Sequence, residues 1–327
     1  MRAAVYRRFG PPEVLALEQV PDPVAGPKDV LVAVRATTVT SAEAAMRRGE
    51  PIWGRVILGF VRPRQRMRTL GIEFAGVVTH VGEAVREFAV GDEVFGFTGF
   101  AIGANAEILR MPAQGSIARK PVSVSFAEAA AVVDGASTAL YFLRDKARLH
   151  AGQKVLVIGA SGSIGTYAIQ LARHFGAEVT GVCSTSNVEL VLSLGAHEVI
   201  DYTRGEIGER QFDLIIDNIG NHSLAQRRKM MAPTGKCVVI GAPKKGKLLG
   251  PITAMVRAVI GSKFRKQKFV PFMAATNAAD LEVLAGFLAD GRVVPVVTQA
   301  YSLADAPDAF RRIEDGHTRG KLVLAIG

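Results

Sequence analysis

A glycine-rich turn between a strand pattern and a helix pattern constrains the fold of this 327-residue chain more than any other feature. The segment reads KVLVIGASGSIGTYAIQLARHFGAEV (154–179), in which a short apolar run leads into the glycines and a helical pattern follows. Glycines allow the backbone to approach a pyrophosphate, and a helix N-terminus offers N–H groups that bind anions. The context predicts a dinucleotide-binding domain, with a ligand-free tight turn as the alternative. The predicted cofactor contacts are Gly159, Ala160, Ser161, Gly162, Ser163, Ile164 and Gly165.

Strand and helix patterns alternate after Lys154, which predicts βαβ units and a parallel sheet covered on both faces. The fold class is therefore α/β, with a doubly wound Rossmann sheet. We expect strands at 154–158, 178–183, 197–200, 212–216 and 236–240, and helices at 163–175, 187–194 and 222–231. The run QKFVPFM (267–273) is a candidate sixth strand.

The first third of the chain has β patterns, and the last third has a mixed tail. Short valine-rich runs at 2–6, 29–36, 74–82 and 92–98 predict a compact, barrel-like antiparallel unit. After Pro121 the pattern becomes helical, and Ser125 with Glu128 forms a capping box. The tail predicts a helix at 278–289, a strand at 292–298, a helix at 304–315 and a strand at 321–326. These closing elements do not fit further parallel repeats, so we expect them to return to the first domain.

The loop VTGVCSTSN (179–187) bears on the choice of nucleotide. An acidic residue at the end of the second strand would bind both ribose hydroxyls and repel a 2′-phosphate. Ser184, Thr185 and Ser186 stand there instead, and hydroxyl groups can donate to phosphate oxygens. We therefore predict NADPH over NADH, by a modest margin because the loop contains no cation. Either another basic residue, Arg204 or a lysine of 244–247, reaches the phosphate, or the preference is modest.

The formal net charge of +10 is unevenly distributed. No acid lies between Asn218 and Ala279, and the segment from Arg55 to Arg68 has five arginines and no acid. Nucleic acid or an anionic membrane surface could account for this charge. We favour a positive surface that attracts an anionic cofactor and keeps the protein soluble, since no nucleic-acid-binding motif accompanies the charge.

The compartment is predicted from what the sequence does not contain. The N-terminus has no signal-peptide pattern, and no run of about 18 apolar residues predicts a membrane span. The two cysteines, Cys183 and Cys237, form no CxxC pair, which is typical of a reducing compartment. We expect a cytoplasmic protein.

The chain resembles the medium-chain dehydrogenase/reductase superfamily, in its zinc-independent quinone-oxidoreductase-like branch. The resemblance rests on MRAAVYRRFGPPEVL, LGIEFAGVVTHVG, GASTALYFL, the glycine turn, LSLGAHEVIDYT, DLIIDNIG and RGKLVLAIG. It implies a GroES-like domain built from residues 1–121 and 276–327, a Rossmann domain at 122–275, and a homodimer.

The same resemblance implies that zinc is absent. Thr40, Ile72 and Asp134 stand where zinc-dependent members have ligands, although Glu73 is kept, and the four-cysteine structural zinc lobe is missing. Ala42 and Ala45 replace the family's proton relay. Reduction of an activated acceptor is then easier than alcohol oxidation, because hydride can add to a quinone or enone and water can supply the proton.

Further site residues are assigned from the resemblance. Thr40, Ser41 and Asp134 form the polar part of the substrate site, although Asp134 could instead cap a helix turn. Thr138 is expected beside the nicotinamide, with a helix back-bond as the alternative, and Tyr202 lines the adenosine end or packs at a strand end. Ligands bind at the carboxyl edge of open α/β sheets, which adds Asn218, Gly220, Gly241 and Ala242 to the cofactor contacts.

Two further features have several interpretations. Trp53, the only tryptophan, is either a lid or pocket wall, or a packing residue. The basic stretch 248–268 is read as a flap or subunit contact in preference to a membrane-surface helix.

The predicted function is an NADPH-dependent, zinc-independent reductase of quinones or α,β-unsaturated carbonyls. The alternatives are a zinc-less NADP-dependent oxidoreductase acting on another carbonyl or alcohol, and a non-catalytic NADPH-sensing or interaction protein.

Overall fold

The computed structural model describes residues 1–241, 266–270 and 276–327. It divides into two compact units, Met1–Asp134 with Thr276–Gly327, and Gly135–Ala275. The sequence places the domain boundary at 121/122, whereas the division observed here falls inside helix α3 (Phe126–Leu140).

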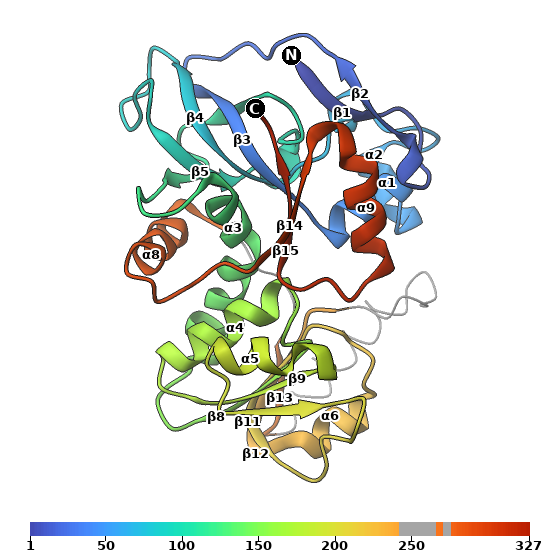
Figure 1. Ribbon diagram of the computed structural model, residues 1–327, viewed down its shortest axis with the longest axis vertical. Helices are drawn as coiled ribbons and strands as arrows, with labels where there is room; N and C mark the ends of the chain where they lie inside the picture. The colour runs from blue at the N-terminus through green and yellow to red at the C-terminus, as the bar shows by residue number, and fades with distance from the viewer. Residues whose placement is uncertain (242–265, 271–275) are drawn as a thin grey trace. The chain divides into compact units, whose positions relative to one another are not determined.

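The second unit is built on a six-stranded sheet in the order β10-β9-β8-β11-β12-β13, and every neighbouring pair is parallel (Figure 1). Chain order therefore runs outward from β8 in both directions, which is the doubly wound arrangement with its switch point beside β8. The strands are β8 (Lys154–Ile158), β9 (Glu178–Cys183), β10 (Glu198–Asp201), β11 (Phe212–Asp217), β12 (Met231–Val239) and β13 (Lys268–Val270). Among the described residues its helices are α4 (Ser163–His174), α5 (Val188–Ser193) and α6 (Leu224–Met230), and a π-helical segment, Tyr141–Ala147, continues α3.

The first unit contains a seven-stranded sheet made from both chain ends. Its path is β14-β15-β3-β4-β5-β7, and β6 pairs with β3 off that path. The C-terminal β15 pairs antiparallel with β3, so the tail returns to the first domain as expected. A small sheet pairs β1 with β2. The strands are β1 (Arg2–Tyr6), β2 (Leu15–Gln19), β3 (Asp29–Val39), β4 (Glu73–Val81), β5 (Glu93–Phe97), β6 (Ile108–Pro112), β7 (Ser116–Arg119), β14 (Val297–Ser302) and β15 (Lys321–Ala325).

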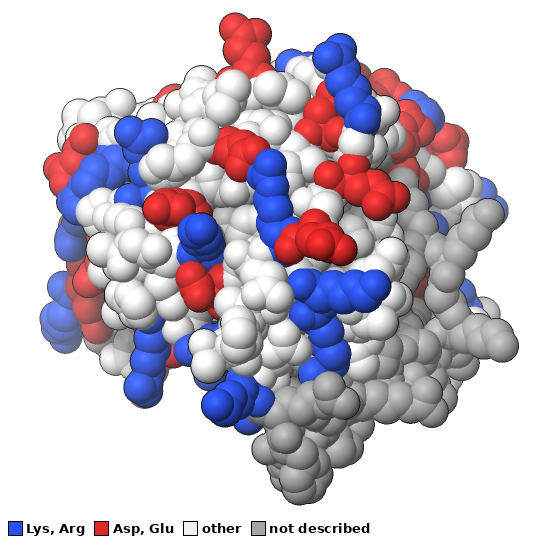
Figure 2. Space-filling model, turned by 90° about the horizontal axis from the view of Figure 1, so that it is seen from below, with Lys and Arg blue, Asp and Glu red and all other residues white. Residues whose placement is uncertain are grey.

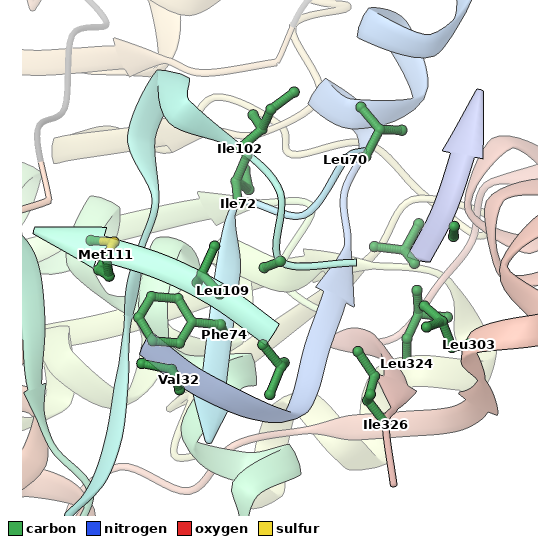
Figure 3. Close-up of a cluster of buried hydrophobic side chains, with 14 of the residues drawn as sticks. Val32, Leu70, Ile72, Phe74, Ile102, Leu109, Met111, Leu303, Leu324 and Ile326 are labelled. Atoms are coloured by element: carbon green, nitrogen blue, oxygen red, sulfur yellow. The ribbon is translucent and has the colours of Figure 1, made fainter. Parts of the chain in front are cut away.

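Four helices accompany α3 in the first unit, as far as the described residues extend: α1 (Ser41–Arg48), α2 (Arg55–Leu58), α8 (Ala278–Ala289) and α9 (Ala306–Asp315). The core of this unit gathers side chains from segments far apart in the chain. In Figure 3, Val32, Phe74 and Leu109 lie together, and Leu324 and Ile326 of the C-terminal segment lie near Leu303 in the same cluster. These side chains other than Leu303 are at most 5% exposed, so the closing strand is part of the same core as Val32, Phe74 and Leu109.

Several predicted elements differ from the structure. The tail strand runs over Val297–Ser302 and not 292–298, and the sequence did not predict β2, β6, β7 or α1. Ser125 does form the predicted capping box, because its Oγ accepts from Glu128 N at 3.2 Å and the Glu128 carboxylate accepts from Ser125 N at 2.8 Å. Most of 248–268 lies outside the described residues.

The charged surface is mixed where it can be seen. Figure 2 shows basic and acidic side chains interspersed over much of the described part of one face. Among the described residues one helical stretch, Phe126–Ala147, is long and apolar enough to cross a membrane, but 72% of its most apolar window is buried. Such burial is typical of a core helix.

Candidate active site

The glycine turn at the end of β8 has the geometry of a cofactor cradle. Gly159 adopts φ +74°, a left-handed conformation that favours glycine. A Cβ on Gly165 would lie 2.2 Å from Gly159 O, so only glycine permits the close packing of α4 on the turn. Gly162 N-caps α4 without any side-chain hydrogen bond, which leaves N–H groups at the helix start for a ligand. A pyrophosphate fits this cradle.

Predicted contacts from neighbouring strands lie beside the turn. The Asn218 amide donates to Ile158 O at 3.0 Å, and its Oδ1 is buried with no hydrogen-bond partner in the described structure. A Cβ on Gly159 would be 3.4 Å from Asn218 Cβ, and a Cβ on Gly241 would be 2.2 Å from Asn218 O. An unsatisfied buried oxygen at a strand end is consistent with a bound ligand. Gly220 donates to Asp217 Oδ1 at 2.8 Å, and Ala242 lies outside the described residues.

Thr138 lies on α3 and is 3% exposed. The same helix reaches the start of α4, because a Cβ on Gly135 would be 3.0 Å from both Ser163 O and Ser163 Oγ. Within this unit the structure therefore brings the helix of Thr138 to the glycine turn.

An acidic residue, Asp201, lies beside the loop after β9, and the sequence alone did not predict it there. The register pairs Asp201 of β10 with Cys183 of β9, so Asp201 lies beside the loop of Ser184, Thr185 and Ser186. Thr185 Oγ1 donates to Asp201 Oδ2 at 2.5 Å, and Thr203 Oγ1 donates to Asp201 Oδ1 at 2.7 Å. These hydrogen bonds lower the pKa of Asp201. The pairing of β9 and β10 as parallel neighbours could have identified Asp201, because the carboxyl ends of both strands lie at the same edge of the sheet.

Two other groups lie at this edge. Arg204 Nε lies 3.5 Å from Asp201 Oδ2, and its side chain is otherwise exposed. Tyr202 donates its backbone N–H to Cys183 O at 3.1 Å, and its side chain is exposed rather than packed in the core. The edge thus has hydroxyls, a carboxylate, a guanidinium and an aromatic ring.

In the first unit, Thr40 is coupled to a buried glutamate. Thr40 is the N-cap of α1, and its Oγ1 accepts from Glu43 N at 3.2 Å. The Thr40 hydroxyl also lies 2.8 Å from Glu43 Oε2 as a hydrogen-bond donor, and Gly71 N donates to Glu43 Oε1 at 2.7 Å. Burial raises the pKa of Glu43 to about 7, against the opposing effect of these hydrogen bonds. The sequence TSAE (40–43) is a capping-box pattern that could have identified this pair.

A second buried carboxylate links four elements. Glu73 of β4 accepts from Lys321 Nζ of β15 at 2.5 Å, from the Thr38 hydroxyl of β3, and from Asp134 N of α3 at 2.6 Å. Glu73 is fully buried and Lys321 is 3% exposed. Burial raises the pKa of Glu73, and Lys321 opposes that effect. The charge of Glu73 also raises the pKa of Glu43, and the charge of Lys321 lowers it.

The positions at which zinc-dependent relatives have ligands do not hold a set of zinc ligands in this chain. Ile72 is buried in the apolar core, and the Thr40 hydroxyl is bound to Glu43. Within residues 1–241, 266–270 and 276–327, no group of three or more His, Cys, Asp or Glu side chains could hold a metal ion. Ser41 follows Thr40 with an exposed side chain, and Trp53 is 48% exposed rather than packed.

Comparison with known proteins agrees with this arrangement. A family model described as alcohol dehydrogenase GroES-like domain matches residues 26–122, and one described as zinc-binding dehydrogenase matches residues 194–324. The mitochondrial NAD(P)H oxidoreductase RTN4IP1 of Mus musculus is 31% identical, over 100% of this chain and 89% of that protein. The quinone oxidoreductase of Mus musculus is 32% identical, over 100% of this chain and 98% of that protein.

A solved structure extends the similarity to three dimensions. The quinone oxidoreductase from Coxiella burnetii matches with a TM-score of 0.87 at 26% identity, covering 100% of this chain and 99% of that one. The chain belongs to the medium-chain dehydrogenase/reductase superfamily. Within that superfamily it falls in the quinone-oxidoreductase-like branch, and it is an NAD(P)H-dependent oxidoreductase. The family, the fold class and the enzyme class predicted from the sequence are confirmed.

Proposed function

We propose that this medium-chain dehydrogenase/reductase is a zinc-independent, NADPH-dependent reductase of quinones or α,β-unsaturated carbonyls. The observation that supports it most is the cradle around Gly159 and Gly165, which fits a dinucleotide, in a chain whose zinc-ligand positions are Thr40, Ile72 and Asp134. Bound NADPH would supply hydride to the acceptor. The protein's own tasks are then to hold the cofactor, orient the acceptor and provide a proton.

The residues at the ends of β9 and β10 would hold the adenosine end. Ser184 and Ser186 offer hydroxyls to a 2′-phosphate, and Arg204 offers a cation. Asp201 opposes them with a negative charge, which Thr185 and Thr203 partly stabilise through hydrogen bonds. These opposed charges support a modest preference for NADPH over NADH. We assign Tyr202, Asn218, Gly220, Gly241 and Ala242 to the same cofactor site, and Thr138 to the nicotinamide end.

The pair Thr40–Glu43 would supply the proton after hydride transfer. Glu43 donates its proton to Thr40 Oγ, and Thr40 passes its hydroxyl proton to the reduced acceptor, so that the acceptor gains one hydride and one proton. Because Glu43 is fully buried, water then returns a proton to Glu43 by way of the Thr40 hydroxyl. A general acid works best when its pKa lies near the working pH, and Glu43 meets that condition through burial. Ser41 and Asp134 complete the polar part of the proposed substrate site.

A turnover screen tests the proposal. NADPH and NADH oxidation are followed in parallel with a panel of quinones and enones, and with an aldehyde and an alcohol as other substrate classes. The proposal expects turnover of quinones or enones, faster with NADPH and unchanged by a zinc chelator. Tight NADPH binding without turnover of any acceptor would favour a non-catalytic sensor instead.

We also propose that the protein is a homodimer, as the resemblance implies. We further propose that it is cytoplasmic, because its two cysteines are far apart in the sequence. Both cysteines of the chain are buried and free.

A further inference from the structure

The segment between α1 and β4 exposes an unusual group of apolar side chains. Of the sixteen large hydrophobic residues that are exposed in the described structure, six fall between positions 52 and 61. Val61 is 88% exposed and Phe60 is 70% exposed. A monomeric soluble protein rarely leaves so many neighbouring apolar groups in water without a binding function. We call this group the Trp53 patch, and it consists of Ile52, Trp53, Val56, Ile57, Phe60 and Val61.

Buried residues of the same segment attach it to the core of the first unit. Leu58 and Met67 of the same segment are 6% and 3% exposed and belong to the core of the first unit. The chain turns at Gly59 with φ +123°, and Arg64 Nη2 donates back to Val56 O at 2.9 Å. The segment therefore has its own core contacts, and the exposed side chains are those left over after the core is filled.

Exposed cations accompany the apolar groups. No acid occurs between Glu50 and Glu73 in the sequence, and Arg62, Arg64 and Arg66 are all exposed. Within the described ranges no carboxylate lies within ion-pair distance of these three guanidinium groups. Arg55 differs, because it donates to Gly49 O and stacks 4.8 Å above the Phe9 ring. The three exposed arginines, which we call the basic rim, thus add positive charge to the same segment, and no acid of that segment compensates it.

The combination of exposed apolar and basic side chains favours one kind of binding partner over the others. A second copy of the chain would place the basic rim against itself, with no acid in the patch to compensate it. A nucleic acid would use the arginines but would leave six apolar side chains without a role. An anionic bilayer accommodates both, because apolar side chains enter the interface and cations meet the lipid headgroups.

We propose that the Trp53 patch docks the protein on the surface of an anionic phospholipid membrane. The inference does not depend on the substrate or on the cofactor preference. It does suit a reductase of quinones, since apolar acceptors concentrate in lipid.

Trp53 makes the test direct, because it is the only tryptophan in the chain. The protein is mixed with vesicles of phosphatidylcholine, or of phosphatidylcholine with phosphatidylserine, and both sedimentation and tryptophan emission are measured. We expect sedimentation and a blue shift of the Trp53 emission with phosphatidylserine, both weakened by salt. Replacing all three arginines by Ser should weaken binding by roughly 100-fold or more.

Matched variants separate docking from general effects. Phe60→Ser with Val61→Ser should abolish the blue shift, whereas Val90→Ser with Val122→Ser, which changes two exposed valines elsewhere, should not. Thermal unfolding confirms that each variant is folded. Sedimentation with an unchanged Trp53 emission would overturn the proposal. So would concentration-dependent dimerisation that is lost in the Phe60/Val61 variant, because the patch would then be a subunit interface.

Discussion

Glu43 is a buried acid whose protonation state should affect the stability of the fold. Its pKa rises from an ordinary 4.5 to about 7 in the folded protein, so the folded state binds this proton more tightly than the unfolded state. The contribution to stability is fully present below pH 4.5 and is lost as pH rises through 7. The loss amounts to at most about 3 kcal/mol. Glu73 and Lys321 are its charged neighbours and modulate the size of the effect.

Replacing Glu43 by Gln should therefore flatten the pH dependence of stability. The free energy of unfolding of Glu43→Gln should change less between pH 5 and pH 8 than that of the unmodified protein. Urea titrations at both pH values measure the difference. Glu128→Gln, in the capping box at Ser125, is the matched control and should keep the original profile. An unaltered profile in Glu43→Gln would show that another group is responsible.

Asp201 should limit the preference for NADPH. Its carboxylate lies beside Thr185, where it would repel a 2′-phosphate, so Asp201→Asn should raise the NADPH/NADH ratio of kcat/KM. The expected rise is up to about five-fold, as for charge pairs near a protein surface. Arg204→Ala should lower the same ratio. Glu178→Gln removes one charge at the opposite end of β9 and should leave it unchanged.

The surroundings of single residues were the hardest feature to predict from the sequence. The hydroxyls at 184–186 could be read from the sequence, but Asp201 could not, because its position depends on the register of β10 against β9. Lys321 was likewise beyond prediction, since only the fold brings it 2.5 Å from Glu73, which is 248 positions away in sequence. Glu43 could have been identified from the TSAE pattern, yet its burial depends on the packing of α1 and Gly71.

At the scale of elements, the contact between α4 and the glycine turn should tolerate no side chain. A Cβ at Gly165 would meet Gly159 O at 2.2 Å, so Gly165→Ala must move α4 or the turn. We expect a loss of about 1–3 kcal/mol in the free energy of unfolding and weaker NADPH binding. Gly286→Ala in α8 is the control, because its Cβ would meet nothing within 4 Å. It should stabilise the helix by up to about 1 kcal/mol. Urea unfolding measures the stability of each variant, and NADPH fluorescence titration measures its affinity for the cofactor.

Elements with a strong local signal were predicted closely. The strands Lys154–Ile158 and Glu178–Cys183 and the helix Ala278–Ala289 have the predicted limits, because apolar periodicity and glycine breaks coincide there. The tail strand was misplaced because RVVPVVT (292–298) is rich in valine, whereas Pro295 lacks an N–H for the ladder and β14 begins only at Val297. The helix Ser41–Arg48 was missed since its pattern is short.

At the scale of the molecule, the Glu73–Lys321 ion pair links the C-terminal strand β15 to strand β4 of the N-terminal part of the chain. Lys321→Met would leave the Glu73 charge buried without its partner, which should cost about 3–5 kcal/mol in the free energy of unfolding. The double variant Glu73→Gln with Lys321→Met should recover much of that loss. Lys28→Met, at an exposed position, should change stability by less than about 0.5 kcal/mol. Equal destabilisation by the single and double variants would contradict an electrostatic origin.

The return of the tail to the first domain was predictable as a topology but not as a set of contacts. The sequence indicated that the closing elements do not continue the parallel sheet. The pairing of β15 with β3, and the shared core of Val32, Phe74 and Leu324, depend on long-range packing that no local pattern encodes.

The ratio of kcat/KM for NADPH to that for NADH, measured with one quinone acceptor in the presence of a zinc chelator, tests the proposed function most directly. We predict activity that the chelator does not reduce, and a ratio modestly above one that rises in Asp201→Asn. Faster turnover with NADH, or activity lost on chelation, would contradict it.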